Sequence, residues 1–434
     1  MAGVRISVRR VRQAAPFVIG FLFFGFLLLW LPGRPFQAQP LSPPSSAIPA
    51  SLFGLHMHRA ATTTPWPAVP FATWRLWDAY VAWANLEPRK GDWHFEILDK
   101  YVALAEAHRV ELLLPLGLSP TWASARPKEP SGYDPGNAAE PKNIADWRDY
   151  VRTVATRYKQ RIRSYEIWNE PNLKQFFTGS PEQMVTLVRE AYKILKEVDP
   201  SNTLVSPSAT GIDGVAWLDQ FLQKGGGDYV DVIGHHFYVS PNPPESMLNQ
   251  IARAKEVMAK RGVGDKPLWD TETGWLIENH KTVVEPQRGS FSKVLSDDEA
   301  SGYVARSFIL TWAAGVSRFY WYAWDNYIMG LTEADGTTLK PPAKAYVEVQ
   351  RWLVGARVRA CRTNAETTWV CEIAREGGYE GWIVWNPLRR VGLEIPKTWG
   401  IQNARDLAGG TRNLQGTSKI EIGPSPLLLE RPGR

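Results

Sequence analysis

The sequence predicts an α/β fold, a (β/α)8 barrel that is followed by a small β-sandwich-like domain. Eight short apolar segments alternate with helical patterns between Leu52 and Trp324, and this alternation is typical of a parallel sheet. Eight parallel strands with intervening helices are the number that closes a barrel. Beyond residue 355 apolar and polar residues alternate, as in 381–386 and 419–422, which is typical of antiparallel strands.

The predicted strands are residues 52–58, 73–77, 111–117, 164–169, 203–208, 231–236, 266–272 and 318–324. Helices are predicted at 95–108 and 144–160, where apolar residues recur at spacings of three and four, and a last helix at 345–354. Two more helices are predicted by capping boxes, Ser180-Pro-Glu-Gln183 and Ser296-Asp-Asp-Glu299. We therefore expect the barrel over residues 51–355 and the β domain over residues 356–434.

The first 31 residues are predicted to be a signal-anchor or a signal peptide. Residues 1–13 contain four arginines and no acid, and residues 14–31 are uncharged and rich in Phe and Leu. This run reaches the lower limit of a membrane span, about 17 to 20 residues, so we favour an uncleaved anchor with its arginines in the cytoplasm. The barrel would then face the periplasm; a cleaved signal and a secreted or periplasmic protein are the alternative. Residues 32–50 contain six prolines and are predicted to be a linker.

The charge distribution argues against a nucleic-acid partner. Seven of the 50 basic side chains precede Asp78, the first acid of the chain, so that 43 basic and 44 acidic side chains remain. A nearly neutral body is not the surface that binds a phosphate backbone. The chain also contains 20 tryptophans, and exposed indole rings often stack on sugars.

The two cysteines of the chain, Cys361 and Cys371, lie close together in the predicted β domain. Their spacing suits a disulfide across a hairpin in an oxidising compartment, and two buried thiols are the alternative. Two cysteines without a nearby histidine cluster make a poor zinc site. The sequence predicts no metal and no cofactor.

Two segments end in an acid at the carboxyl end of a predicted strand. Residues 164–172 read Ser-Tyr-Glu-Ile-Trp-Asn-Glu-Pro-Asn, with Glu170 directly before a proline that ends the strand. Residues 266–275 have the same form, with Glu272 followed by Gly274. Ligands of parallel barrels bind at this rim, so two rim carboxylates predict cleavage of a glycosidic bond. Two glutamates in ordinary salt bridges are the alternative.

Three motifs, in this order, resemble those of the clan A glycoside hydrolases: 83–91 (Trp-Ala-Asn-Leu-Glu-Pro-Arg-Lys-Gly), 168–171 (Trp-Asn-Glu-Pro) and 271–274 (Thr-Glu-Thr-Gly). Within the clan, residues 52–326 are most similar to family 39 and related polysaccharide endoglycosidases. The resemblance implies a retaining barrel enzyme with Glu170 as general acid and base and Glu272 as nucleophile. Such a pair lies about 5 to 5.5 Å apart, and an anionic Glu272 would keep Glu170 protonated.

The resemblance also implies that Asn169 binds the sugar 2-hydroxyl, with a turn-capping asparagine as the alternative. On a regular strand Asn169 and Glu170 would point to opposite faces, so we expect a β-bulge at this position. Arg75, in an apolar strand, requires a buried partner. The resemblance places Arg75 beside Glu272, and a structural ion pair with Asp78 or another acid is the alternative.

His236 and Tyr238 have the same parity at the end of the predicted sixth strand. By resemblance Tyr238 binds the nucleophile and His236 positions the substrate or the acid, although a histidine satisfied within the core is an alternative. Trp324 is predicted to be the stacking floor for the sugar, with Trp321 as the competing choice and a place in the core as the alternative for both.

Trp122 and Trp275 follow the predicted strands three and seven, where they would extend the substrate-binding cleft; a place in the core is the alternative for both. The predicted function is endo-acting hydrolysis of an extracellular polysaccharide or exopolysaccharide, with the envelope polysaccharide machinery as a further partner. An exo-acting β-xylosidase-like enzyme and a non-catalytic polysaccharide-binding or assembly protein are the alternatives.

Overall fold

The computed structural model describes residues 41–281, 283–284 and 291–433. The described residues all belong to one compact unit. The predicted signal-anchor and residues 32–40 of the predicted linker therefore lie outside the described residues. Within the described ranges, no helix combines the length and the apolar character that a membrane span requires.

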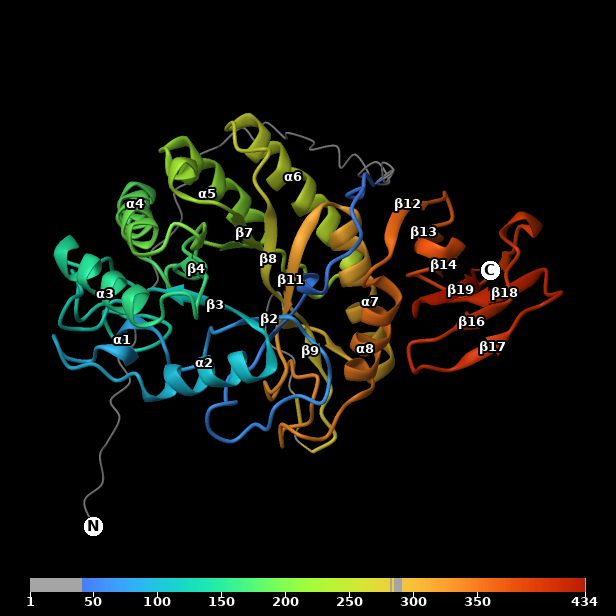
Figure 1. Cartoon of the computed structure of the whole chain (residues 1–434), viewed down its shortest axis with the longest axis horizontal. Coiled ribbons are helices and arrows are strands. Elements are labelled where there is room, and N and C mark those ends of the chain that lie inside the picture. The colour runs from blue at the N-terminus through green and yellow to red at the C-terminus, as the bar shows by residue number, and fades with distance from the viewer. Residues whose placement is uncertain (1–40, 282, 285–290, 434) are drawn as a thin grey trace, which may run out of the picture. The chain divides into compact units, whose positions relative to one another are not determined.

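A parallel sheet of nine strands forms the centre of the molecule (Figure 1). Its strands, in chain order, are β1 (Phe53–His56), β2 (Thr73–Arg75), β3 (Glu111–Leu116), β4 (Ser164–Ile167), β5 (Thr203–Val205), β6 (Ala209–Thr210), β7 (Ile233–His236), β8 (Leu268–Thr273) and β11 (Val316–Trp321). The spatial order is β5-β4-β3-β2-β1-β11-β8-β7-β6. All eight predicted strands are present, and the predicted strand 203–208 is divided into β5 and β6.

The division of this strand closes the sheet into a barrel. β5 pairs with β4 at one end of the strand order, and β6 pairs with β7 at the other end. Val205 of β5 also forms a parallel bridge with Val232, directly before β7. Because β5 and β6 follow one another in the chain, the two ends of the sheet meet at this point.

The helices surround the strands (Figure 1). They are α1 (Trp83–Leu86), α2 (Glu96–His108), α3 (Ile144–Arg157), α4 (Pro181–Val198), α5 (Gly211–Gln223), α6 (Met247–Lys260), α7 (Asp297–Ala313) and α8 (Pro341–Leu353). Both predicted capping boxes are confirmed: Ser180 and Ser296 each accept a hydrogen bond from the third residue of their helix, which bonds back to the cap. Helix α8 begins earlier than predicted, since prolines are tolerated in a first helical turn.

Side chains from several strands fill the interior of the barrel. Leu113, Val205, Val232, Trp269 and Tyr320 form a buried cluster of their own. Gly54 lies beside this cluster, where a Cβ atom would come within 2.7 Å of the Tyr320 ring. The large side chains of the interior therefore require a glycine at this position.

Antiparallel strands form the C-terminal β domain, as predicted. The strands are β12 (Arg357–Thr363), β13 (Trp369–Ala374), β14 (Glu380–Trp385), β15 (Val391–Glu394), β16 (Asn403–Arg405), β17 (Thr411–Asn413), β18 (Lys419–Ile422) and β19 (Leu427–Arg431). Six of them form one sheet, in the order β12-β13-β14-β19-β16-β17, and β15 pairs with β18. Cys361 and Cys371 are paired residues of β12 and β13 and form a disulfide. Of the two predicted alternatives, the structure has the hairpin disulfide.

Candidate active site

The turn after β4 brings Asn169 and Glu170 into the site together. Strand β4 ends at Ile167, and both Trp168 and Glu170 have left-handed backbone conformations, with φ values of 62° and 43°. The predicted β-bulge is thus replaced by two left-handed residues that redirect the chain. Non-glycine residues rarely adopt positive φ, and such strain is often found at functional sites.

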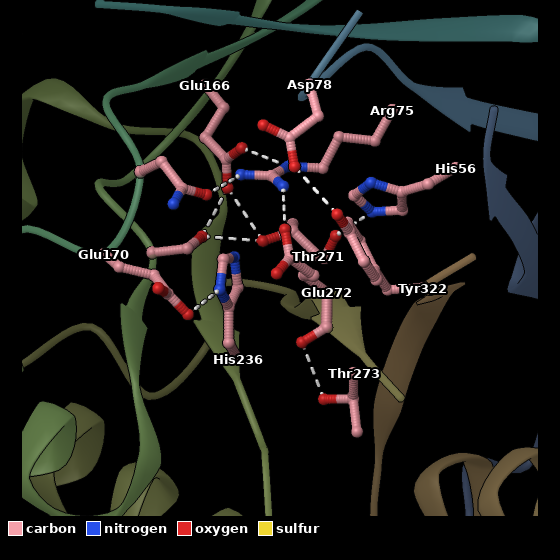
Figure 2. Close-up of polar contacts among 12 residues, drawn as sticks. His56, Arg75, Asp78, Glu166, Glu170, His236, Thr271, Glu272, Thr273 and Tyr322 are labelled. Carbon is pink, nitrogen blue, oxygen red and sulfur yellow. Dashed lines mark hydrogen bonds and ion pairs between the residues drawn. The ribbon is translucent and has the colours of Figure 1, made fainter. Parts of the chain in front are cut away.

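Arg75 connects the residues of the site with one another (Figure 2). Its guanidinium donates hydrogen bonds to Glu166 (2.6 Å), Glu272 (2.8 Å) and Asn169 (2.8 Å). The Arg75 side chain is fully buried, and three acceptors compensate for the burial of its charge. The predicted position beside Glu272 is confirmed. Of the alternative partners, Asp78 makes other contacts, whereas another acid, Glu166, does form an ion pair with Arg75.

Glu166 is a member of the site that sequence reasoning missed. It is fully buried on β4 and accepts hydrogen bonds from the hydroxyls of Thr271 (2.7 Å) and Ser208 as well as from Arg75. The signal was present in the sequence, because an acid between Tyr165 and Ile167 on an alternating strand faces the barrel interior.

Glu170 and Glu272 lie close to each other, although they are far apart in the sequence. One oxygen of each carboxylate and a ring nitrogen of His236 all lie within 4.8 Å of one another. Oxygens that are no more than 4.8 Å apart exclude the spacing of about 6.5 to 9.5 Å of inverting glycosidases and agree with the close carboxyl pair, about 5 to 5.5 Å apart, of retaining ones. Tyr238 donates a hydrogen bond to Glu272 over 3.1 Å, as predicted.

Burial and mutual repulsion make it unfavourable for both carboxyls to be ionised. Burial raises the pKa of Glu170 to about 7, although the Thr210 hydroxyl and Arg75 act in the opposite direction. Burial also raises the pKa of Glu272, while the adjacent charge of Arg75 and the Tyr238 hydroxyl lower it. Two such groups share one proton. Because Glu272 alone touches the guanidinium and the phenol, we place the charge on Glu272 and the proton on Glu170.

His236 contacts the predicted acid, with 3.0 Å between its Nδ1 and Oε1 of Glu170. Burial and the charge of Arg75 hold the pKa of His236 well below its usual value, so the ring is neutral. Its Nε2 is buried and has no hydrogen-bond partner among the described residues. The contact with Glu170 favours the predicted positioning role over that of a histidine satisfied within the core.

The cluster of Glu170, His236 and Glu272 also has the residue types of a metal site. However, Glu272 already pairs with the fully buried guanidinium of Arg75, whose positive charge would repel a divalent cation. A second group, formed by Glu278, His280 and Asp297, lies at the surface. His280 is exposed and pairs there with the buried Glu333 and with Asp297, so this group is accounted for by ion pairs.

Asp78 and two tyrosines form a part of the site that the sequence did not predict. Tyr322 donates a hydrogen bond to Asp78 over 2.7 Å, and Tyr133 donates another to the second carboxylate oxygen. The rings of His56 and Tyr322 lie 5.0 Å apart (Figure 2). Tyr322 is the first residue after β11. At this end of the strand it is thus a tyrosine that contacts the polar residues of the site.

The predicted stacking tryptophans require correction. Trp324 is only 2% exposed and the rings of Trp275 and its neighbour Trp321 are fully buried, 5.7 Å apart in a stacked arrangement. Trp275 therefore belongs to the core and cannot extend the cleft, and neither Trp324 nor Trp321 offers an open face to a sugar. Trp122 is half-buried and donates its indole N–H to the backbone oxygen of Glu87. Trp122, Trp275 and Trp321 pack against other aromatic rings, which covers part of their large apolar surface.

A barrel with two adjacent rim carboxylates, an arginine on one and a histidine on the other, is an arrangement typical of glycoside hydrolases, the enzymes that act on O-glycosyl bonds. The model of Glycosyl hydrolases family 39 matches residues 76–268, a range that includes Glu170 and ends just before Glu272. The predicted resemblance to family 39 of clan A is thereby confirmed.

Two curated relatives are similar over parts of the chain. A protein named beta-xylosidase from Caldicellulosiruptor saccharolyticus is 34% identical over 141 residues, which are 30% of this chain and 27% of the relative. Another beta-xylosidase, from Geobacillus stearothermophilus, is 27% identical over 202 residues, which are 41% of this chain and 39% of the relative. The chain thus spans well under half the length of these relatives.

Solved structures share the fold over most of the chain. A family 39 glycoside hydrolase from Bacteroides cellulosilyticus WH2 superimposes with a TM-score of 0.69 at 20% identity. The match covers 88% of this chain and 81% of the chain of that hydrolase. A monomeric beta-xylosidase from Caulobacter crescentus CB15 has a TM-score of 0.62 at 16% identity, covering 89% and 97%. At these identities the similarity concerns the fold alone.

Proposed function

We propose that this protein is a retaining β-glycosidase that uses a double displacement. The observation that supports the proposal best is the close pair of Glu170 and Glu272, in which only Glu272 touches Arg75. In the first step the Glu272 carboxylate attacks the anomeric carbon, and Glu170 donates its proton to the departing glycosidic oxygen. The product of this step is a sugar bound covalently to Glu272.

The second step uses the same residues in reversed roles. Esterification removes the charge of Glu272, so the repulsion that keeps Glu170 protonated disappears. Glu170 then takes a proton from water, which attacks the anomeric carbon and releases Glu272. Asn169 is held by Arg75 over 2.8 Å, which orients its amide for a hydrogen bond to the sugar 2-hydroxyl.

For the substrate, we propose endo-acting cleavage within an extracellular polysaccharide. A location outside the cytoplasm is supported by the predicted N-terminal segment and by the disulfide between Cys361 and Cys371, because disulfides persist in oxidising compartments. Exo-acting β-xylosidase activity is the second candidate, and it is favoured because both relatives described above are named beta-xylosidase.

A panel of defined β-linked oligosaccharides tests the reaction and the substrate together. Proton NMR of the first-formed product should reveal a β anomer, and an initial α anomer would contradict a retaining mechanism. Products of intermediate length indicate endo action, whereas successive release of single xylose units indicates the exo alternative.

Glu272→Gln separates an enzyme from a binding protein. The enzyme should lose hydrolysis in this variant, whereas a non-catalytic binder would keep its ability to retain polymer and would lack activity already in the wild type. Glu366→Gln is a matched control, because Glu366 is exposed in the β domain. Hydrolysis that survives Glu272→Gln would refute the proposed nucleophile.

A further inference from the structure

A pocket of about 380 Å³ lies at the rim of β2 and β3. The segment after β2 and the segments at the end of β3 line it, and its lining includes Asp78, Tyr80, Asn85, Leu118, Tyr133 and Asp134. The two proposed catalytic glutamates are not among these residues. The pocket is thus lined by side chains other than the catalytic pair.

Asp78 connects this pocket with the catalytic residues. It lines the pocket and accepts hydrogen bonds from Tyr133 and from Tyr322. Its charge acts on both acids, since it raises the pKa of Glu170 and of Glu272. A carboxylate has about four acceptor positions, so Asp78 retains acceptor capacity for a further hydroxyl.

Aromatic rings line the pocket and remain exposed. Tyr80 is 71% exposed and Tyr133 is 40% exposed, although rings of this size usually bury their apolar faces. Tyrosine combines an apolar ring with a polar hydroxyl, which suits a sugar with its alternating C–H and O–H groups.

The backbone around the pocket is strained. Asp78, Tyr80 and Leu118 all have left-handed conformations, with φ values of 55°, 57° and 62°. Non-glycine residues in this region store strain, and they gather at binding and catalytic sites. At Asp78 and Tyr80 the strain falls on two of the side chains best suited to contact a ligand.

The charge of the lining restricts the ligand. Two acids, Asp78 and Asp134, line the pocket, and the described lining residues include no lysine or arginine. A carboxylate-bearing sugar would face repulsion without compensation. An uncharged sugar can instead donate its hydroxyls to Asp78.

From these observations we propose that the pocket is a second saccharide subsite, which binds an uncharged sugar unit next to the unit that is cleaved. The proposal rests on the proposed glycosidase activity, because it assigns the neighbouring part of the same substrate chain. Tyr80 and Tyr133 would contact the sugar ring, and Asp78 would accept its hydroxyls. The subsite would make the enzyme prefer substrates of more than one unit.

The test compares kcat/KM for a 4-nitrophenyl β-monoglycoside with kcat/KM for β-linked oligosaccharides of two to five units, in the xylose and the glucose series. The wild type should gain at least tenfold for one added unit. In Tyr80→Ala this ratio of kcat/KM values should be about tenfold smaller than in the wild type, which is the order of magnitude of one aromatic contact. Tyr80→Phe should keep the wild-type ratio. Asn85 is a second exposed residue of the pocket lining. Asn85→Ala should also reduce the gain, and it provides the test if Tyr80→Ala does not fold.

Tyr327→Ala is the matched control, because Tyr327 is 51% exposed and does not line the pocket. A gain that is unchanged in both Tyr80→Ala and Asn85→Ala, or a wild type without any gain, would overturn the subsite while leaving the glycosidase proposal intact. An equal gain with uronic-acid oligosaccharides would overturn the uncharged ligand. A wild type that cleaves none of the substrates would refute the glycosidase activity and the subsite with it.

Discussion

Glu170→Gln offers the sharpest test of the roles within the carboxylate pair. The amide has nearly the same size as the carboxyl, but it can neither donate nor accept the catalytic proton. General acid–base catalysis typically contributes about 10²- to 10⁴-fold, so we expect a loss of this size in kcat/KM for an unactivated glycoside. The Glu366→Gln control should retain wild-type activity.

The structure also predicts the pH dependence of the wild type. Glu170 must be protonated for the first step, and its pKa is raised to about 7. Activity is therefore present below this pH and is lost as the pH rises through it, with kcat/KM falling roughly tenfold for each further pH unit. In Glu170→Gln no proton remains to be lost, so this alkaline limb should disappear.

A pair of aryl glycosides separates the acid from other causes of low activity. A dinitrophenolate leaves without a proton, so kcat/KM for its glycoside, which reports the first step, should fall little in Glu170→Gln, while kcat/KM for a poorer leaving group falls strongly. The kcat for the dinitrophenyl glycoside should fall, because the second step has lost its base. Azide, which needs no base, should restore turnover of the activated substrate and yield a β-glycosyl azide. An alkaline limb that persists in the variant, or an equal loss for both leaving groups, would refute the assignment.

Three further predictions concern the residues around the pair and the β domain. Arg75→Met leaves buried carboxylates without a counter-charge, and should lower the free energy of unfolding by about 3 to 5 kcal/mol in urea, with Arg75→Lys less affected; equal stability of Arg75→Met and wild type would contradict it. Tyr238→Phe removes a hydroxyl that lowers the pKa of Glu272, so the acid limb of kcat/KM should move to higher pH, and an unmoved limb would count against Glu272 as the ionised nucleophile. Replacing both Cys361 and Cys371 with serine should cost about 3 kcal/mol in urea unfolding without reductant, whereas equal midpoints would argue against a disulfide that stabilises the β domain.

Local signals in the sequence determined much of the fold. Apolar segments separated by helical patterns predicted all eight barrel strands, and the capping boxes at Ser180 and Ser296 placed the starts of two helices. Glu170 and Glu272 could be found in the same way, because each stands at the end of a strand. These signals depend on residues two to four positions apart, so they can be read without the tertiary structure.

Only the closed barrel decided which residues meet in the site. Arg75 reaches Glu272 across 197 positions of the chain, and Tyr322 reaches Asp78 across 244. No local period encodes contacts at such separations. The tryptophans illustrate the same limit, since Trp275 was expected in the cleft but is buried against Trp321. Composition predicts that an indole ring will contact something flat and apolar, and the packing of the barrel decides whether that partner is a sugar or the core.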